Sequence, residues 1–161
     1  MIHIHHVNLH RFVGGGEIYT RALTRALLDA GARVTLHVHP AARLWDSLAG
    51  AYLAIAPAES ESQLLEHLPA KDAIVLTQSP LSGECVARLA ARHRLSGFAH
   101  MPAFQRSAAE FRPYRLVFTV SRYCIGLLQN AGLTQVYPEA VYGSAELARE
   151  SHVAADLIIP V

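Results

Sequence analysis

The chain has 161 residues, which fits one domain, because roughly 100–200 residues usually share one hydrophobic core. Apolar residues make up 52% of the chain, a share that disfavours disorder and allows a packed interior. The formal net charge of +1 argues against bulk binding of nucleic acid.

The charges are unevenly distributed along the chain. The stretch from Arg88 to Arg122 holds seven arginines and a single acid, Glu110, whereas the stretch from Glu59 to Asp72 is acidic. Two interpretations stay open. Either these charges are solvated helix faces, or the arginines attract an anionic acceptor or a membrane surface.

The cysteines and the apolar runs indicate the compartment. Cys85 and Cys124 match no metal-binding spacing and are too few for a disulfide framework, so we expect both to be buried on helices. No apolar run approaches the ~18 residues of a membrane span, and the first residues lack the features of a secretory signal. We expect a soluble, cytoplasmic protein, with peripheral contact to the inner face of the membrane as a further interpretation.

Strand-like and helix-like segments alternate along the chain. In order, they predict a strand at Ile2–Leu9, a helix at Glu17–Ala30, a strand at Val34–Val38, a short helix at Leu44–Leu48, a strand at Ala51–Ala56, a helix at Ser62–Leu68, a strand at Ala73–Thr77, a helix at Leu81–His93, strands at Leu95–His100 and Arg115–Val120, a helix capped by Ser121 that runs through Ala131, and a strand at Thr134–Tyr137. Strands separated by helices predict βαβ units, hence a doubly wound α/β fold with a parallel sheet covered on both faces.

The first helix is amphipathic. One face is apolar and is expected to pack on the sheet; it comprises Ile18, Ala22, Leu23, Ala26, Leu27 and Ala30. Gly31 stands where a left-handed residue would end that helix, and Gly132 holds the same place after the last helix. In doubly wound folds ligands bind at the carboxyl ends of the strands, which points to the loops after Leu9, Thr77, Ala99 and Val120.

We assign residues 1–142 to one Rossmann-like domain and residues 143–161 to a tail or to the start of a linker. In this last part, Ala145–Ser151 predicts a helix and Asp156–Val161 a strand.

The strongest local signal is Gly14-Gly15-Gly16-Glu17, between the first strand and the first helix. Glycines at such a junction let a ligand approach the backbone, and a helix start offers free N–H groups to phosphate or sugar oxygens. The alternative is a turn that only reverses the chain.

Two other phosphate-binding loops do not match. A P-loop needs a Gly-Lys pair, and the sequence contains none. A dinucleotide-binding fingerprint needs a glycine where Tyr19 stands and an acid near the end of the second strand, where His37–Pro40 stands instead. A nicotinamide-dependent oxidoreductase is therefore disfavoured.

The glycine turn, with Glu17 and an amphipathic helix after it, resembles the opening of the GT-B glycosyltransferases, particularly the retaining family 4 type. Phe98–Pro102 is similar to a motif of that family in which a strand ends in a histidine. Val117–Ser121, followed by a helix and Gly132, is similar to its strand-serine-helix-glycine block. The likeness spans about Ile4 to Tyr142.

The resemblance implies roles for particular residues. Gly14, Gly15 and Gly16 would form the loop that faces the donor phosphate and the acceptor, with Glu17 at the helix start, where complementing the helix dipole is its alternative role. His100 would face the reacting sugar as the catalytic residue, with a hydrogen-bonded structural histidine as the alternative. Ser121 and Arg122 are candidate anion-binding residues, although Ser121 also fits an N-cap.

The resemblance further implies the acceptor-binding half of a retaining, metal-independent glycosyltransferase without a cofactor. Its partners would be a nucleotide-sugar donor, held mainly by a second domain that these residues do not include, and a glycan, lipid-linked or other hydroxyl acceptor. The 161 residues alone are expected to be inactive, and no nucleic acid is expected to bind. The alternative is a stand-alone doubly wound module that binds a phosphorylated ligand without catalysis.

Histidines are abundant near the start and on the second predicted strand. His3 and His5 share one face of a strand, as do His37 and His39. No carboxylate or cysteine completes a metal site there, so we expect none.

Overall fold

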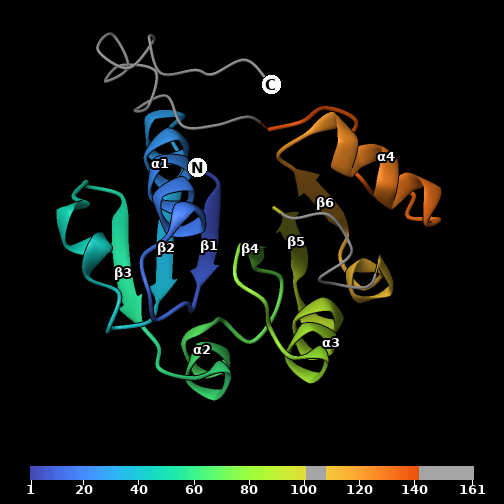
Figure 1. Cartoon of the computed structure of the whole chain (residues 1–161). Coiled ribbons are helices and arrows are strands. Elements are labelled where there is room, and N and C mark those ends of the chain that lie inside the picture. The colour runs from blue at the N-terminus through green and yellow to red at the C-terminus, as the bar shows by residue number, and fades with distance from the viewer. Residues whose placement is uncertain (101–107, 142–161) are drawn as a thin grey trace, which may run out of the picture.

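All six strands of the sheet pair in parallel. Their order across the sheet is β3-β2-β1-β4-β5-β6 (Figure 1). A computed structural model describes residues 1–100 and 108–141. The strands are β1 (His3–Asn8), β2 (Arg33–Val38), β3 (Leu53–Pro57), β4 (Ile74–Thr77), β5 (Arg94–Ala99) and β6 (Leu116–Thr119). The described helices are α1 (Gly15–Asp29), α2 (Glu61–His67), α3 (Gly83–Arg92) and α4 (Arg122–Asn130), with 3-10 turns η1 (Arg43–Ser47) and η2 (Ala108–Phe111).

This strand order confirms the expected doubly wound α/β fold. The chain leaves β1 toward β2 and β3, crosses back to β4 beside β1, and continues to β5 and β6. The direction of winding therefore reverses between β1 and β4, and the loops that follow these two strands diverge. Ligands of such sheets bind at this switch point, outside the carboxyl ends of the strands.

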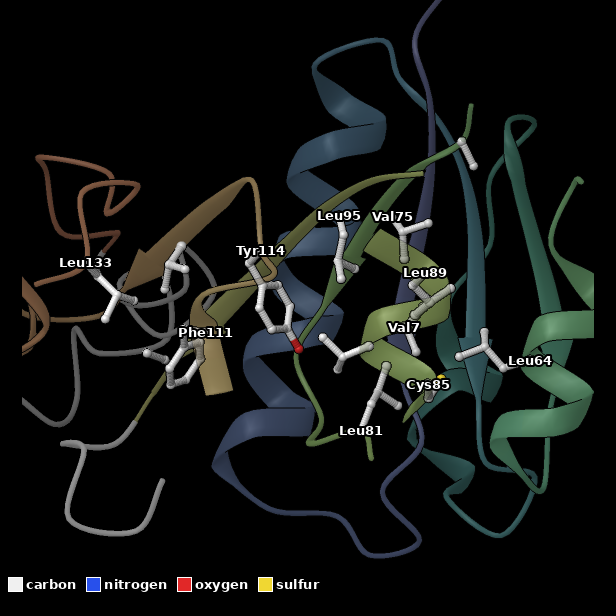
Figure 2. Close-up of a cluster of buried hydrophobic side chains, with 14 of the residues drawn as sticks. Val7, Leu64, Val75, Leu81, Cys85, Leu89, Leu95, Phe111, Tyr114 and Leu133 are labelled. Atoms are coloured by element: carbon white, nitrogen blue, oxygen red, sulfur yellow. The ribbon is translucent and has the colours of Figure 1, made fainter. Parts of the chain in front are cut away.

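The larger hydrophobic core lies between one face of the sheet and helices α2, α3 and α4. Figure 2 shows Val7 and Val75, from neighbouring strands, gathered with Leu89 and Cys85 of α3. Cys85 and Cys124 are both buried, as expected, and burial raises the pKa of the Cys85 thiol to about 11. Leu89, on the helix predicted at Leu81–His93, is fully buried.

A smaller cluster lies on the opposite face of the sheet, beside η1. Leu36 and Val38 of β2 pack with Trp45 and two neighbours there, Ala42 and Leu48. Helix α1 runs along β1 and β2 (Figure 1). The two clusters belong to opposite faces of β2 and β1 because successive residues of a strand alternate between faces.

The predicted inner face of α1 is wrong. Its buried residues are Glu17, Thr20 and Thr24, whereas Ile18 is 38% exposed and Ala26 is exposed. The reason lies in the strand beneath it. β1 presents two polar residues to α1, and these need partners: His6 hydrogen bonds to the Thr24 hydroxyl (2.8 Å), and Asn8 donates to the Thr20 hydroxyl (2.9 Å).

Several element ends differ from the sequence-based expectation. α1 begins two residues early, so that Gly15 and Gly16 form its first turn. The strand predicted at Thr134–Tyr137 is reduced to one bridge between Val136 and Val117. Gly31 and Gly132 do adopt positive φ, at 81° and 84°, as helix-ending residues.

The helix predicted at Ala145–Ser151 and the strand predicted at Asp156–Val161 lie outside the described residues, as does the whole of the tail 143–161. Among the described residues, no helix combines the length and the apolar character that crossing a membrane requires.

Candidate functional site

The glycine turn lies at the switch point, directly after β1. Gly14 is the N-cap of α1 with φ −144°, and its carbonyl accepts the first helical hydrogen bond, from Ile18 N–H at 3.1 Å. None of the three glycines has a positive φ. A Cβ atom added at Gly15 or Gly16 would meet no atom within 4 Å. Neither backbone conformation nor packing within the described chain therefore requires glycine at positions 15 and 16.

Glu17 anchors this turn from inside. Its side chain is buried, and Oε2 accepts a hydrogen bond from Gly14 N–H (2.8 Å), which forms half of a capping box. Oε1 lies 2.7 Å from Nδ1 of His10 and 3.4 Å from Nδ2 of Asn8. Glu17 is thus a fully engaged buried carboxylate, which exceeds the simple helix-dipole role considered from the sequence.

The surroundings keep Glu17 ionised. Burial raises the pKa of its carboxyl, but hydrogen bonds from its own backbone, from His10 and from Gly14 N–H outweigh burial and hold the pKa below the usual value. His10 is half exposed, at 49%, while the Glu17 side chain is 4% exposed. The pair therefore joins an inner carboxylate to an outer imidazole.

A hollow of about 480 Å³ opens over this pair. Its wall is made by one continuous stretch of chain, Leu9–Gly14, together with Glu17. Phe12 and Val13 stand on the outer part of this stretch and are 83% and 53% exposed. The hollow thus combines apolar side chains with the polar His10–Glu17 pair.

His100 follows β5 on the same edge of the sheet. Its ring stacks on Phe98, with centroids 5.5 Å apart, and meets the Tyr19 ring edge-on at 5.2 Å. Burial lowers the pKa of His100, the Glu17 carboxylate acts in the opposite direction, and His10 lowers it further. His100 Nε2 is buried and has no hydrogen-bond partner among the described residues. The structure therefore places His100 within electrostatic reach of Glu17, with one buried ring nitrogen that lacks a partner among the described residues.

Ser121 and Arg122 are not part of this cluster. Ser121 is the N-cap of α4, and its hydroxyl accepts from Cys124 N–H at 3.1 Å. Arg122 is exposed in the first turn of the same helix. Both follow β6, and β4 and β5 separate that edge strand from β1. The capping role that the sequence offered as an alternative for Ser121 is the one observed.

Sequence reasoning missed the polar residues that close the switch point. Gln78 directly follows β4, and its backbone N–H donates to the Val7 carbonyl at 2.9 Å. Ser79 then accepts from Leu9 N–H through its hydroxyl, also at 2.9 Å. Two polar residues after the buried run of β4 were the available signal, but only the pairing of β4 with β1 assigns them to this site.

The Gln78 side chain is buried and incompletely satisfied. One end of its amide bonds to the Thr20 hydroxyl, which also donates to the Gly16 carbonyl at 2.8 Å and accepts from Asn8. Nε2 of Gln78 has no partner among the described residues. The Thr20 hydroxyl carries one proton, so it can donate to the Gly16 carbonyl or to Gln78 but not to both. If the Gln78 amide is turned so that Nε2 donates to this hydroxyl, the amide oxygen is left unpaired instead. One polar atom at the base of the first turn of α1 is left over in either orientation.

A second connection crosses the carboxyl edge of the sheet. The chain returns after β6, where Val141 N–H donates to the Thr119 carbonyl at 2.8 Å. The carbonyl of Val141 accepts from the Tyr19 hydroxyl at 3.1 Å. Because the Tyr19 ring also contacts His100, Tyr19 links α1 to the segments that follow β5 and β6. Burial raises the pKa of Tyr19 to about 12.

The histidines of β1 and β2 form a separate cluster on the opposite face of the sheet. His5 Nδ1 lies 3.0 Å from His37 Nε2, and His3 bonds to the Thr35 hydroxyl at 2.9 Å. Burial, reinforced by neighbouring histidines, lowers the pKa of His5 to about 4 and that of His37 to about 3. In residues 1–100 and 108–141, no group of three or more histidine, cysteine or acidic side chains could hold a metal ion.

Comparison of the chain with protein-family models, with curated proteins and with solved structures finds no significant match. A functional assignment therefore rests on the site geometry and on the sequence motifs themselves.

Proposed function

We propose that this chain is the N-terminal, acceptor-side half of a GT-B-type glycosyltransferase, which moves a sugar from a nucleotide-diphosphate donor to a hydroxyl acceptor. The observation that carries the proposal is the presence of glycine at both positions 15 and 16. Neither residue has a positive φ, so other residues could adopt the same backbone conformation. A Cβ added at either position would contact no described atom within 4 Å. Among the described residues nothing requires glycine at these two positions, and the close approach of a ligand to the backbone would account for it.

The first turn of α1 suits a diphosphate. By helix geometry the amide groups of Gly15 and Gly16 have no partner within the helix. They stand at the positive end of a 15-residue helix. The Glu17 carboxylate turns inward, where it accepts from Gly14 N–H. The exposed side of this turn can therefore take up negative charge on a leaving diphosphate without a metal ion.

His100 supports a sugar site beside the phosphate site. Its buried Nε2 has no protein partner among the described residues, although buried polar atoms are almost always paired. If the donor sugar reaches this nitrogen on binding, one of its hydroxyls would give it a partner. The motif resemblance then assigns the rest of the donor site to a second domain, which these 161 residues do not contain.

Binding tests the phosphate part of the proposal. We would titrate the chain with UDP and UDP-glucose and follow the amide signals by NMR. We expect the amides of Gly15 and Gly16 to shift, with Kd on the order of millimolar because most donor contacts are missing. Gly15→Val should abolish these shifts, while Gly126→Ala, at a site on α4 with no atom within 4 Å of the added Cβ, should not. Unchanged amide signals would contradict the proposal.

Transfer tests the reaction itself. This chain, joined to its donor-binding domain, should transfer sugar from a nucleotide donor, while the 161 residues alone should give no turnover. Binding at Gly15 and Gly16 without transfer by the longer polypeptide would favour a binding module for a phosphorylated ligand. Turnover by the 161 residues alone would contradict the division of labour between two domains.

A further inference from the structure

A second pocket lies at the opposite edge of the sheet, where the parallel strands begin. This amino-edge pocket has a volume of about 470 Å³ and is formed by the starts of β1, β4 and β5 and by the loop that leads into β4. Sites for small molecules typically measure roughly 300–1,000 Å³. Strand β1 runs from His3, at this edge, to Asn8, just before the glycine turn. A ligand in the amino-edge pocket would therefore not occupy the carboxyl edge.

Two basic side chains line this pocket without an acidic partner. Lys71 belongs to the loop before β4, and Arg94 begins β5 beside Ile74 of β4. Both residues are exposed, and within residues 1–100 and 108–141 neither forms an ion pair with a carboxylate. Asp72 is the single acid among the described lining residues. The pocket therefore carries an excess of positive charge, which favours an anion.

The histidines at the start of β1 add hydrogen-bonding groups to the pocket. His3 Nε2 bonds to the Thr35 hydroxyl at 2.9 Å, and His5 Nδ1 contacts His37 Nε2 at 3.0 Å. Each ring thus uses one nitrogen within the sheet, and the other nitrogen has no hydrogen-bond partner among the described residues. The two rings lie side by side, with centroids 4.5 Å apart. Imidazole N–H groups beside basic side chains form a donor set that suits an oxyanion.

Asp72 has an unusual backbone conformation at the rim of the pocket. Its φ of 64° is the only positive value of a non-glycine residue in the described part of the chain. Its N–H donates to the Arg92 carbonyl at 2.7 Å, which fixes the loop between Lys71 and β4. The carboxylate of Asp72 opposes a bound anion, so removing its charge is a change that should improve binding.

We propose that the amino-edge pocket binds a small oxyanion of the phosphate class, either free or carried on a small organic body. Lys71 and Arg94 supply the positive charge, while His3 and His5 donate hydrogen bonds and take up a proton as the anion enters. The volume exceeds that of the anion alone, and the apolar side chain of Ile2 offers contact to an organic body. This site goes beyond the proposed transfer reaction and does not depend on it.

Proton uptake follows from the groups that surround these histidines. Burial is the largest cause that lowers the pKa of His3 and of His5, the latter to about 4. The other titratable and charged groups around them are Arg33 and His37 on β2, His67 on α2, Lys71 and Asp72 in the loop before β4, Arg92 and His93 at the end of α3, and Arg94 on β5. Asp72 is the one acid in this set, so the charged imidazoles gain little stabilisation in the free protein.

A bound dianion changes this balance. Its negative charge raises the pKa of a neighbouring imidazole, so the complex holds a proton that the free protein lacks. By linkage, the affinity for the anion must then rise as the pH falls.

Sulfate is the first probe, because it keeps both negative charges from about pH 8 to about pH 5 and any change in its affinity reports protons bound by the protein. We would titrate the chain with sodium sulfate at constant ionic strength and follow the backbone amides by NMR. The amides of His3, Asp72 and Ala73 should shift, with Kd on the order of millimolar at about pH 7.5. At about pH 5.5 we expect Kd to be about tenfold lower. Inorganic phosphate and glycerol 1-phosphate then distinguish a free anion from a phosphorylated compound, since tighter binding of the ester indicates the latter.

Three substitutions test the charges in opposite directions. Arg94→Gln and Lys71→Gln, both at exposed positions, should each raise the Kd for sulfate by about fivefold. Asp72→Asn should lower it severalfold, because asparagine tolerates the positive φ and carries no charge. Arg88→Gln, at an exposed arginine of α3 outside the pocket, is the matched control. It changes the net charge by the same amount as Arg94→Gln and should leave Kd within about twofold of the wild type.

Local amide shifts that weaken in Arg94→Gln and strengthen in Asp72→Asn and at acid pH would support the site. Sulfate that leaves the amides around Asp72 unchanged, an affinity that is equal at both pH values, or the same loss in Arg88→Gln as in Arg94→Gln would overturn it. Because these signals are separate from those of Gly15 and Gly16, either result leaves the glycosyltransferase proposal to its own tests.

Discussion

The ring of Tyr114 lies so close to the backbone of Gly97 that a Cβ added there would stand 2.6 Å from its Cε1 atom. The Thr77 hydroxyl would be 3.1 Å away on the neighbouring strand. Tyr114 is buried beside Phe111 in the larger core (Figure 2). Glycine in the middle of β5 is thus explained by packing, in contrast to Gly15 and Gly16.

Gly97→Ala should therefore destabilise the protein. The added methyl group must displace a buried aromatic ring, and overpacking of this kind costs about 1–3 kcal/mol. Gly126→Ala is the control, because its Cβ would meet nothing and alanine suits a helix better by roughly 0.5–1 kcal/mol. Urea unfolding followed by the fluorescence of Trp45, the single tryptophan, measures both. Equal stability of the two variants would contradict the packing described for Tyr114.

Glu17→Ala should cost about 1–3 kcal/mol of unfolding free energy. The change removes the acceptor of the Gly14 N–H and of His10 and one of the two acceptors of Asn8 Nδ2, and hydrogen bonds to a charged group contribute roughly this amount. Glu66→Ala, at an exposed glutamate of α2, should change stability by less than about 0.5 kcal/mol. Thermal or urea unfolding of both variants gives the comparison. A neutral Glu17→Ala would mean that the glycine turn holds without its carboxylate.

His100→Phe separates the chemistry of His100 from its packing. Phenylalanine keeps a ring on Phe98 and beside Tyr19 but removes the unpartnered Nε2. In the proposed two-domain glycosyltransferase we expect kcat to fall by at least about 10²-fold. The unfolding free energy should change by less than about 1.5 kcal/mol. Near-normal kcat together with a large stability loss would identify His100 as a core histidine, and steady-state kinetics beside a denaturant melt distinguish the two outcomes.

Stability should decrease as the pH falls below about 6.5. The folded-state pKa values of His5, His6 and His37 are lowered to about 4, 3 and 3, mainly by burial, from an ordinary value of 6.5. Between 6.5 and these values the unfolded chain binds protons that the folded chain does not. Each histidine then contributes a slope of at most about 1.4 kcal/mol per pH unit.

The same unfolding assay, repeated from pH 7 to pH 4.5, measures this slope. Glu17 acts in the same direction at the acid end, because its lowered pKa contributes stability that is lost as the pH falls below 4.5. His6→Gln should reduce the slope by the contribution of one histidine, at most about 1.4 kcal/mol per pH unit. A stability that is flat between pH 6.5 and pH 5 would show that the buried histidines accept protons without unfolding.

Much of the fold could be predicted because its signals are local. The runs around Val75 and Val117 and the cap signals at Ser121, Gly31 and Gly132 depend on a few neighbouring residues, and each is found where expected. The inner face of α1 was mispredicted for a non-local reason. Ile18 and Ala26 form a regular apolar stripe, but His6 and Asn8 on the strand beneath select Thr24 and Thr20 instead.

Short-range sequence patterns were sufficient to predict a doubly wound α/β sheet with a glycine turn after its first strand. Periodicity and capping are properties of short segments, so they can be read without knowing which strand neighbours which. The assembly of the site, in contrast, depends on contacts between segments that are distant in the sequence. The return of β4 to the side of β1 brings Gln78 to Thr20, and the parallel strands beyond it carry His100 to Tyr19. These contacts depend on which strands become neighbours where the chain crosses over. The periodicity of a single segment carries no information about this.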